Sequence, residues 1–304
     1  MNHPPSRKPP DISSQIFWDR VWEEAGKRSV LKTSQDLHPE RWAAFYDRVA
    51  DLWLDIGGGE DIPGNEVVQE FFHQGILEPG HRVLDVACGP GTFALPLTEH
   101  GLKVTAIDSS PGMIALLRQR AAAREGLTNL KIQQTAWEVY QPGQRFDLVL
   151  AACFPQACQP SGLLRLETWS RGHCALVIGS GAEAFPFRRL LWTRVMKTPL
   201  LDSKAPFYCL INSLMIRGRN PNMLHLSRPV RLVLPLEKVF LFYKHYFSIF
   251  GKRGMKIESL IQEGLTPFVY RNRIRAAGQM SLILIWWRTG QNHSPCRRVK
   301  GGRQ

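Results

Sequence analysis

The segment from Arg82 to Gly91, Arg-Val-Leu-Asp-Val-Ala-Cys-Gly-Pro-Gly, constrains the fold of this chain more than any other. Its apolar first half runs into a turn of small residues that closes on Gly89 and Gly91. A second apolar segment, Lys103 to Asp108, ends in an acid and is followed by a helix start, Ser109 to Met113. Strand, glycine turn, helix, strand and acid are the plan of a nucleoside-binding βαβ unit.

The turn departs from the pattern that binds dinucleotides. It has no third glycine where a pyrophosphate would meet the helix N-terminus. It also places Asp85 four residues before Gly89, where a carboxylate repels a pyrophosphate and can hold an amino-acid ammonium, directly or through water. This combination resembles the class I S-adenosylmethionine-dependent methyltransferases, whose first motif commonly reads Asp-x-x-Cys-Gly-x-Gly. The resemblance covers residues 65–180 and the closing segment 281–288, and its most specific strings are Cys88–Leu97 and Asp108–Met113.

The resemblance implies S-adenosylmethionine as the cofactor and a role for each residue of the motif. Asp85 would accept from the methionine ammonium, Asp108 from both ribose hydroxyls, and the Met113 thioether would lie against the adenine. The backbone of residues 87–91 would pass beneath the methionine part. The cofactor-binding residues predicted in this way are Asp85, Ala87, Gly89, Gly91, Asp108, Ser109, Met113, Ala136, Trp137 and Ala152.

One position departs from the family pattern. After the third strand the family usually has an acid that accepts the adenine amino group, and Ala136 stands there in this chain. Trp137 can still stack on the adenine, and Glu138 or a backbone carbonyl can replace the missing acceptor. Loss of one such hydrogen bond weakens cofactor binding by about tenfold. A non-catalytic binding protein on the same scaffold is therefore one alternative.

The order of segments predicts an α/β fold. Near-continuous apolar runs indicate strands buried on both faces, as parallel sheets require, and they alternate with helical segments. We expect a Rossmann-like, doubly wound, seven-stranded sheet with an N-terminal helical lid and a helical insertion. The resemblance implies that the last strand is antiparallel and lies next to the fifth. The expected strands are residues 82–86, 103–108, 130–134, 146–152, 174–179, 223–234 and 281–288.

Composition suggests the boundaries of the parts. We expect a disordered, proline-rich leader (1–15), the helical lid (16–64), the methyltransferase domain (65–290) and a disordered basic tail (291–304). Within the domain, residues 181–280 form the basic, partly helical insertion on the substrate side. No apolar run is long enough to cross a membrane. The cysteines form no Cys-x-x-Cys pair, so we expect no metal site and a reducing, cytoplasmic location.

Charge divides the chain into two halves. Residues 1–180 hold 17 Lys and Arg against 21 Asp and Glu, whereas residues 181–304 hold 22 against 5. A strongly basic half attracts acidic small molecules, nucleic acid or anionic lipid. We therefore expect a small acceptor that is anionic or aromatic, with RNA as the alternative acceptor. The basic residues in patterned sequence are Arg188, Arg189, Arg194, Lys197, Arg217, Arg219, Arg228 and Arg231.

The catalytic residues stay open at this stage. Cys153, in the loop after the fourth strand, is a candidate nucleophile or metalloid ligand, although a small buried side chain explains it more simply. No spacing singles out a general base. The candidates are His73, His81, His173, His225, His245, Tyr46 and Glu167.

A last alternative concerns membrane contact. Residues 236–250 predict a helix with charged residues on one side and aromatic residues on the other. Such a helix either packs in the core, which we favour, or lies on a membrane surface.

Overall fold

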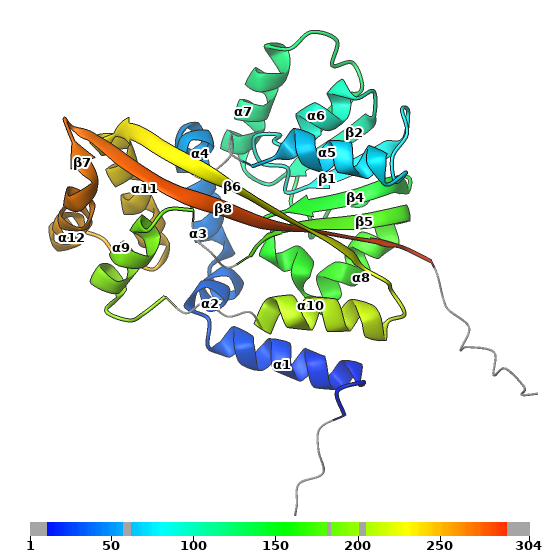
Figure 1. Ribbon diagram of the computed structural model, residues 1–304, viewed down its shortest axis with the longest axis horizontal. Helices are drawn as coiled ribbons and strands as arrows, with labels where there is room; N and C mark the ends of the chain where they lie inside the picture. The colour runs from blue at the N-terminus through cyan, green and yellow to red at the C-terminus, as the bar shows by residue number, and fades with distance from the viewer. Residues whose placement is uncertain (1–10, 57–61, 181–183, 201–204, 291–304) are drawn as a thin grey trace, which may run out of the picture.

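A single twisted sheet organises the computed structural model, which describes residues 11–56, 62–180, 184–200 and 205–290 (Figure 1). The strand order is β3-β2-β1-β4-β5-β8-β6, and the short β7 pairs with β8. The strands are β1 (Arg82–Val86), β2 (Lys103–Asp108), β3 (Leu130–Gln134), β4 (Phe146–Ala152), β5 (Ser170–Gly179), β6 (Asn222–Pro235), β7 (Val269–Tyr270) and β8 (Arg273–Arg288).

The predicted topology is confirmed. Strands β1 to β5 pair in parallel, and β8 pairs antiparallel with both β5 and β6. The last strand therefore lies next to the fifth, as expected. The sheet has eight strands rather than seven because the two-residue β7 adds to the outer end of β8.

Helices cover both faces of the sheet. On one face α5 (Gly64–His73), α6 (Ala94–Glu99) and α7 (Pro111–Ala122) share a core with β1 and β2. On the other face α8 (Pro160–Trp169) and α10 (Ala205–Ile216) share a second core with β4, β5 and the end of β8. The even alternation of buried strand residues between these two cores explains the continuous apolar runs in the sequence.

Strands β6 and β8 continue beyond the sheet as a two-stranded ribbon (Figure 1). Strand β8 begins at Arg273, eight residues before the predicted start at Ser281. Its inward residues, Ile274 and Ala276, belong to a third core with the helices α9 (Phe187–Met196), α11 (Leu236–Ile249) and α12 (Met255–Leu265). Helix α12 has no counterpart among the elements expected from the sequence. Strand β6 matches the expected strand 223–234, but the first half of β8 was not expected, because residues 273–280 are mostly arginines, alanines and a glycine rather than large apolar side chains.

The N-terminal segment forms four helices. They are α1 (Gln15–Lys27), α2 (Val30–Leu37), α3 (Pro39–Arg48) and α4 (Ala50–Ile56). Helix α1 packs on α10, while α3 and α4 contact α7 and α11. The expected disordered leader and tail lie outside the described residues, apart from residues 11–15, where α1 begins at Gln15.

The aromatic face of α11 lies in the core. Phe242, Tyr243, Tyr246 and Phe247 are buried in the third core beside Phe45 of α3. This packing favours the core interpretation of residues 236–250 over the membrane-surface one. Within the described ranges, no helix combines the length and the apolar character that crossing a bilayer requires.

Candidate active site

A cavity of about 270 Å³ opens at the ends of the parallel neighbours β1 and β4, from which the chain continues to β2 on one side and to β5 on the other. This is the switch point at which open α/β sheets bind their ligands. The first residue after each strand has a left-handed backbone conformation. Ala87 follows β1 with φ 54°, and Cys153 follows β4 with φ 53°. L-residues rarely adopt this conformation, and it concentrates at functional sites.

The glycine turn shapes the floor of the cavity. Gly89 has φ +53°, and a Cβ atom added there would meet no atom within 4 Å, so it would project into open space. Gly91 has φ +82°, and a Cβ atom there would lie 2.2 Å from Leu117 Cδ1 of α7. Gly89 thus keeps the cavity open, whereas Gly91 allows α7 to pack closely behind the turn.

Asp108 is held in place by the turn it faces. Its Oδ2 accepts from the Gly89 amide at 2.8 Å, and its Oδ1 accepts from the Ser110 amide at 2.9 Å. Burial raises the pKa of Asp108 above its ordinary value, although these two amides oppose the shift. Each carboxylate oxygen has a second lone pair, so the pair can still accept from two hydroxyls in the cavity.

Asp85 lies deeper and carries an unsatisfied oxygen. Its side chain is buried, and its Oδ2 has no hydrogen-bond partner among the described residues. Burial, together with the nearby Asp108 carboxylate, raises the pKa of Asp85 to about 8. A buried carboxyl oxygen without a partner is costly in the free protein, and it marks a place where a bound cation or donor would be stabilised.

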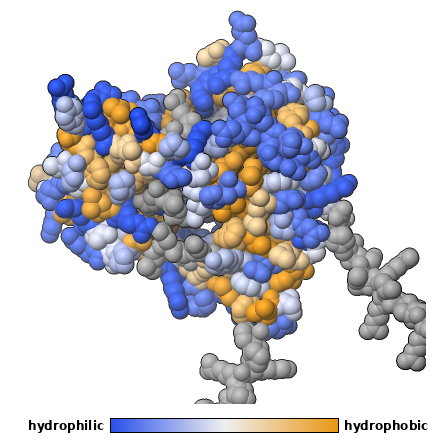
Figure 2. Space-filling view, in the orientation of Figure 1, coloured by the Kyte–Doolittle hydropathy of each residue, from blue (hydrophilic) through white to orange (hydrophobic). Residues whose placement is uncertain are grey.

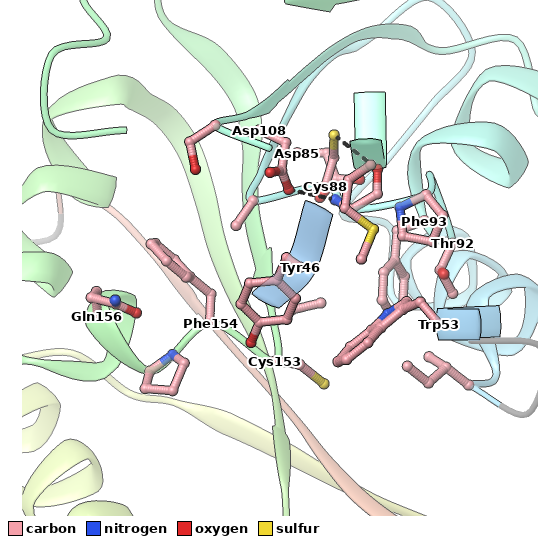
Figure 3. Close-up of a pocket in the computed structure, with 18 of the residues that line it drawn as sticks. Tyr46, Trp53, Asp85, Cys88, Thr92, Phe93, Asp108, Cys153, Phe154 and Gln156 are labelled. Carbon is pink, nitrogen blue, oxygen red and sulfur yellow. Dashed lines mark hydrogen bonds between the residues drawn. The ribbon is translucent and has the colours of Figure 1, made fainter. Parts of the chain in front are cut away.

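Helices α2 to α4 close the cavity from the other side (Figure 3). Tyr46 lies at the centre of the close-up, with Trp53 on one side and Phe154 on the other. Burial raises the pKa of the Tyr46 hydroxyl. Gln35 also contributes to the wall.

A carboxylate fastens α3 to the start of α7. Asp47 Oδ1 accepts from the Ser110 hydroxyl and, at 3.1 Å, from the Gly112 amide. Ser110 is itself the N-cap of α7 and accepts from the Met113 amide at 3.1 Å. The residue next to Tyr46 therefore connects the helix that carries Tyr46 to the start of α7, beside the glycine turn.

The structure brings most of the predicted cofactor residues together. Those that line the cavity are Asp85, Ala87, Gly89, Asp108, Ser109, Met113 and Ala152. Gly91 lies behind the turn, and Ala136 and Trp137 do not line the cavity. The Trp137 ring instead packs edge-on against Phe154, with the Arg165 guanidinium 4.9 Å from its centroid.

The candidate bases are mostly placed elsewhere. Glu167 is committed to Arg219 at 2.8 Å and to the Trp287 indole. Tyr46 lines the cavity, and His225 lines a second cavity next to it. Cys153 is exposed in the wall shared by the two cavities rather than buried as the simpler interpretation expected, and desolvation by the surrounding wall raises the pKa of its thiol to about 11. A neutral thiol is a poor nucleophile. No group of metal-ligating side chains occurs in the described part of the chain.

Sequence reasoning missed most of the wall contributed by the N-terminal helices. Gln35, Trp42 and Trp53 line the cavity, but their only signal was aromatic residues at helical spacing. That spacing predicts a buried helix face without saying what the face covers. The Asp47 contact to α7 had no sequence signal.

Part of this chain is similar to known proteins. Residues 83–166 match the profile of a family described as "Methyltransferase domain". The malonyl-[acyl-carrier protein] O-methyltransferase of Serratia marcescens is 33% identical over 133 residues, which cover 43% of this chain and 46% of that protein. A ubiquinone biosynthesis O-methyltransferase of Coxiella burnetii is 27% identical over 159 residues, covering 51% and 64%.

Among solved structures, a magnesium protoporphyrin IX methyltransferase from Synechocystis PCC 6803 with bound SAH is similar with a TM-score of 0.47 and 16% identity. The match covers 82% of this chain and 93% of that one. The chain spans about half the length of the first curated relative and less than two thirds of the second.

Proposed function

We propose, from the premise that this chain belongs to the class I S-adenosylmethionine-dependent methyltransferases, that it transfers a methyl group from S-adenosylmethionine to a small molecule. The observation that carries the proposal is the contact between two cavities. The crevice at the glycine turn shares Gln35, Cys153, Phe154 and Pro155 with a second cavity. A donor in the first would therefore meet an acceptor in the second.

The residues of the crevice fit the donor. The unpartnered Asp85 Oδ2 suits an ammonium, which would favour the ionised carboxylate. The open space over Gly89 leaves room for a ligand, and Asp108 is oriented by two amides to accept from hydroxyls. Met113 is buried at the cavity wall, where a thioether packs well against a ring.

The chemistry needs little from the protein. S-adenosylmethionine supplies a methyl group that is already activated on a sulfonium, so positioning provides most of the rate. The chain's own residues would hold the donor through Asp85 and Asp108, while Phe154 fills space in the wall shared by the two cavities and Tyr46 fills space in the smaller one. Such packing excludes water from the place where the groups meet.

Two measurements test this function. Calorimetry with S-adenosylhomocysteine should detect binding to the wild-type protein, and Asp108→Asn should weaken it about tenfold to a hundredfold, because a charge-assisted acceptor is lost. Asp51→Asn, an exposed carboxylate on α4, should bind like wild type. Absence of binding to the wild-type protein would overturn the assignment.

The second measurement identifies the kind of acceptor. Methyl-labelled S-adenosylmethionine is incubated with the protein and a cell extract, which is then separated into acid-precipitated and soluble material. We expect label in the soluble fraction. Label in precipitate that ribonuclease releases would favour an RNA acceptor, and binding without any transfer would favour a non-catalytic protein.

A further inference from the structure

The second cavity is much larger than the first. Its volume is about 920 Å³, compared with about 270 Å³ for the crevice at the glycine turn. It lies between α1, α2 and α10 on one side and the ends of β5, β6 and β8 on the other. Figure 2 shows hydrophobic side chains gathered over the lower part of this face, in the region of α1 and α10.

Apolar side chains dominate the wall of this cavity. Ring and branched side chains come from all the surrounding elements, and small or polar residues occupy the gaps between them. The apolar lining residues are Trp22, Leu31, Phe154, Pro155, Ile178, Pro206, Phe207, Leu210 and Ile283, with Tyr208 and the two cysteines beside them. A wall of this kind favours a ligand with an apolar body.

Among the described residues, one charged side chain lines this cavity. Among the described lining residues there is no carboxylate, and Lys32 is the only lysine or arginine. The Lys32 ammonium is bonded to Asp36 one turn further along α2. None of the basic residues that led us to expect an anionic acceptor lines either cavity. An anion bound here would lose its hydration without gaining a free cation, which is costly.

The junction of the two cavities offers neutral polar groups. Gln35 provides a side-chain amide that has no hydrogen-bond partner among the described residues. The raised pKa values of Cys153, in the shared wall, and of Tyr46, in the wall of the smaller cavity, keep both groups protonated near neutral pH. The described residues at the junction therefore supply donors and an amide but no ionised base.

We propose that the larger cavity binds the methyl acceptor, and that this acceptor is an uncharged molecule with an aromatic or alicyclic body and one nucleophilic polar atom at its end. The proposal rests on the proposed function for the direction of transfer. The polar atom would lie at the junction near Gln35, and the apolar body would extend toward Phe207 and Ile283.

The transfer balances without a further reactant. A lone pair on the acceptor atom forms the bond to the methyl carbon, while the electron pair of the breaking carbon–sulfur bond stays on sulfur. Any proton on the acceptor atom leaves to solvent, because the described residues shared by the two cavities, Gln35, Cys153, Phe154 and Pro155, include no ionised base. Acceptor atoms that are nucleophilic without a strong base fit this site best.

A matched pair of probes tests the class of acceptor. Binding of 2-naphthol and of 6-hydroxy-2-naphthoate is measured by calorimetry on the protein saturated with S-adenosylhomocysteine. We expect the neutral naphthol to bind at least about tenfold more tightly than the carboxylate, because the wall offers no free cation. Equal or tighter binding of the carboxylate, or binding of neither, would overturn the proposal.

Two variants on one helix locate the site. Tyr208 lines the cavity and is 51% exposed, so Tyr208→Asp adds a charge to the wall without disturbing a core. Met215, also on α10, is 59% exposed and does not line the cavity. Tyr208→Asp should weaken naphthol binding about tenfold, and Met215→Asp should leave it within about twofold.

The outcomes separate this inference from the proposed function. If S-adenosylhomocysteine binds but the probe binding is the same in both α10 variants, the larger cavity is not the acceptor site and the cofactor assignment stands. If S-adenosylhomocysteine does not bind, the proposed function fails. The naphthol titrations on the free protein then still report whether the cavity prefers uncharged rings.

Discussion

Two carboxylates with different surroundings define the cofactor crevice at the residue scale. Asp108 accepts from two backbone amides, so its geometry is already set in the free protein. Asp85 is buried with one oxygen unpartnered and a raised pKa. Asp108 therefore provides a fixed acceptor, whereas Asp85 provides a buried site that becomes favourable only when a cation or donor arrives.

Asp85 should make stability depend on pH. It ionises near 3.8 in the unfolded chain and near pH 8 in the folded one, so the folded state holds more protons within that window. The free energy of unfolding should therefore fall as pH rises from about 4 to about 8. Asp85→Asn removes this effect, and its Tm at pH 8 should exceed that of wild type by about 2–4 °C.

Melting curves at pH 5 and pH 8, with and without S-adenosylhomocysteine, test this. The ligand ammonium should stabilise wild type more than Asp85→Asn, because only the carboxylate can pair with it. Asp51→Asn serves as the exposed control. The same pH dependence in all three proteins would contradict the role of Asp85.

At the scale of elements, hydrogen bonds join the N-terminal helix α3 to the start of α7, next to the glycine turn. Asp47 of α3 caps the start of α7 through Ser110 and Gly112, and the neighbouring Tyr46 enters the crevice. The α7 backbone leaves little space here, because a Cβ atom on Gly112 would lie 3.0 Å from the Asp47 carbonyl oxygen. Docking of α3 and the shape of the cofactor crevice should therefore be coupled.

Asp47→Ala should loosen this contact. The loss of a capping carboxylate costs about 1–2 kcal/mol, which corresponds to a fall in Tm of a few degrees. We also expect weaker binding of S-adenosylhomocysteine and faster proteolysis within residues 11–56. Asp51→Ala removes an exposed carboxylate from α4 and should change none of these. If both variants behaved alike, the contact would have no part in closing the crevice.

At the scale of the whole molecule, positive charge and the cavities are separate. Arg231 of β6 and Arg273 and Arg275 of β8 are exposed on one face of the ribbon, and neither strand contains an acid. Hydrophilic residues appear along the ribbon at the upper left of Figure 2. This arrangement suits contact with a polyanion outside the site rather than an anionic substrate inside it.

Replacing these three arginines with glutamine should affect polyanion binding alone. The variant should elute from heparin at lower salt than wild type, because it makes fewer contacts with the anionic groups of heparin. Each lost contact reduces the steepness of log K against log salt concentration by about 0.7–0.9. Its affinity for S-adenosylhomocysteine should stay within about twofold. The charge-matched control replaces Arg28, Arg118 and Arg145, which are exposed elsewhere. An equal decrease in the eluting salt concentration of both variants would show that heparin binding depends on total charge rather than on the ribbon arginines.

The expectation of an anionic or aromatic acceptor stays a prediction, and the positions of the arginines show what a count of charges leaves out. The count of basic residues in the second half is correct, but the arginines lie on the ribbon and in ion pairs such as Arg219 with Glu167. Composition records how many charges a segment has. It does not record which way each side chain faces, because that depends on strand register and helix packing.

The sequence by itself determined the βαβ unit and its two acids, because short-range patterns decide them: apolar strands, a turn that needs glycine at Gly91, and an acid directly after β2. Only the tertiary structure decided that Tyr46 closes the crevice, that Trp137 turns to Phe154 and Arg165, and that a large apolar cavity adjoins the cofactor site. These features join residues far apart in the chain. Their positions follow from how helices dock on the sheet, which no local pattern encodes.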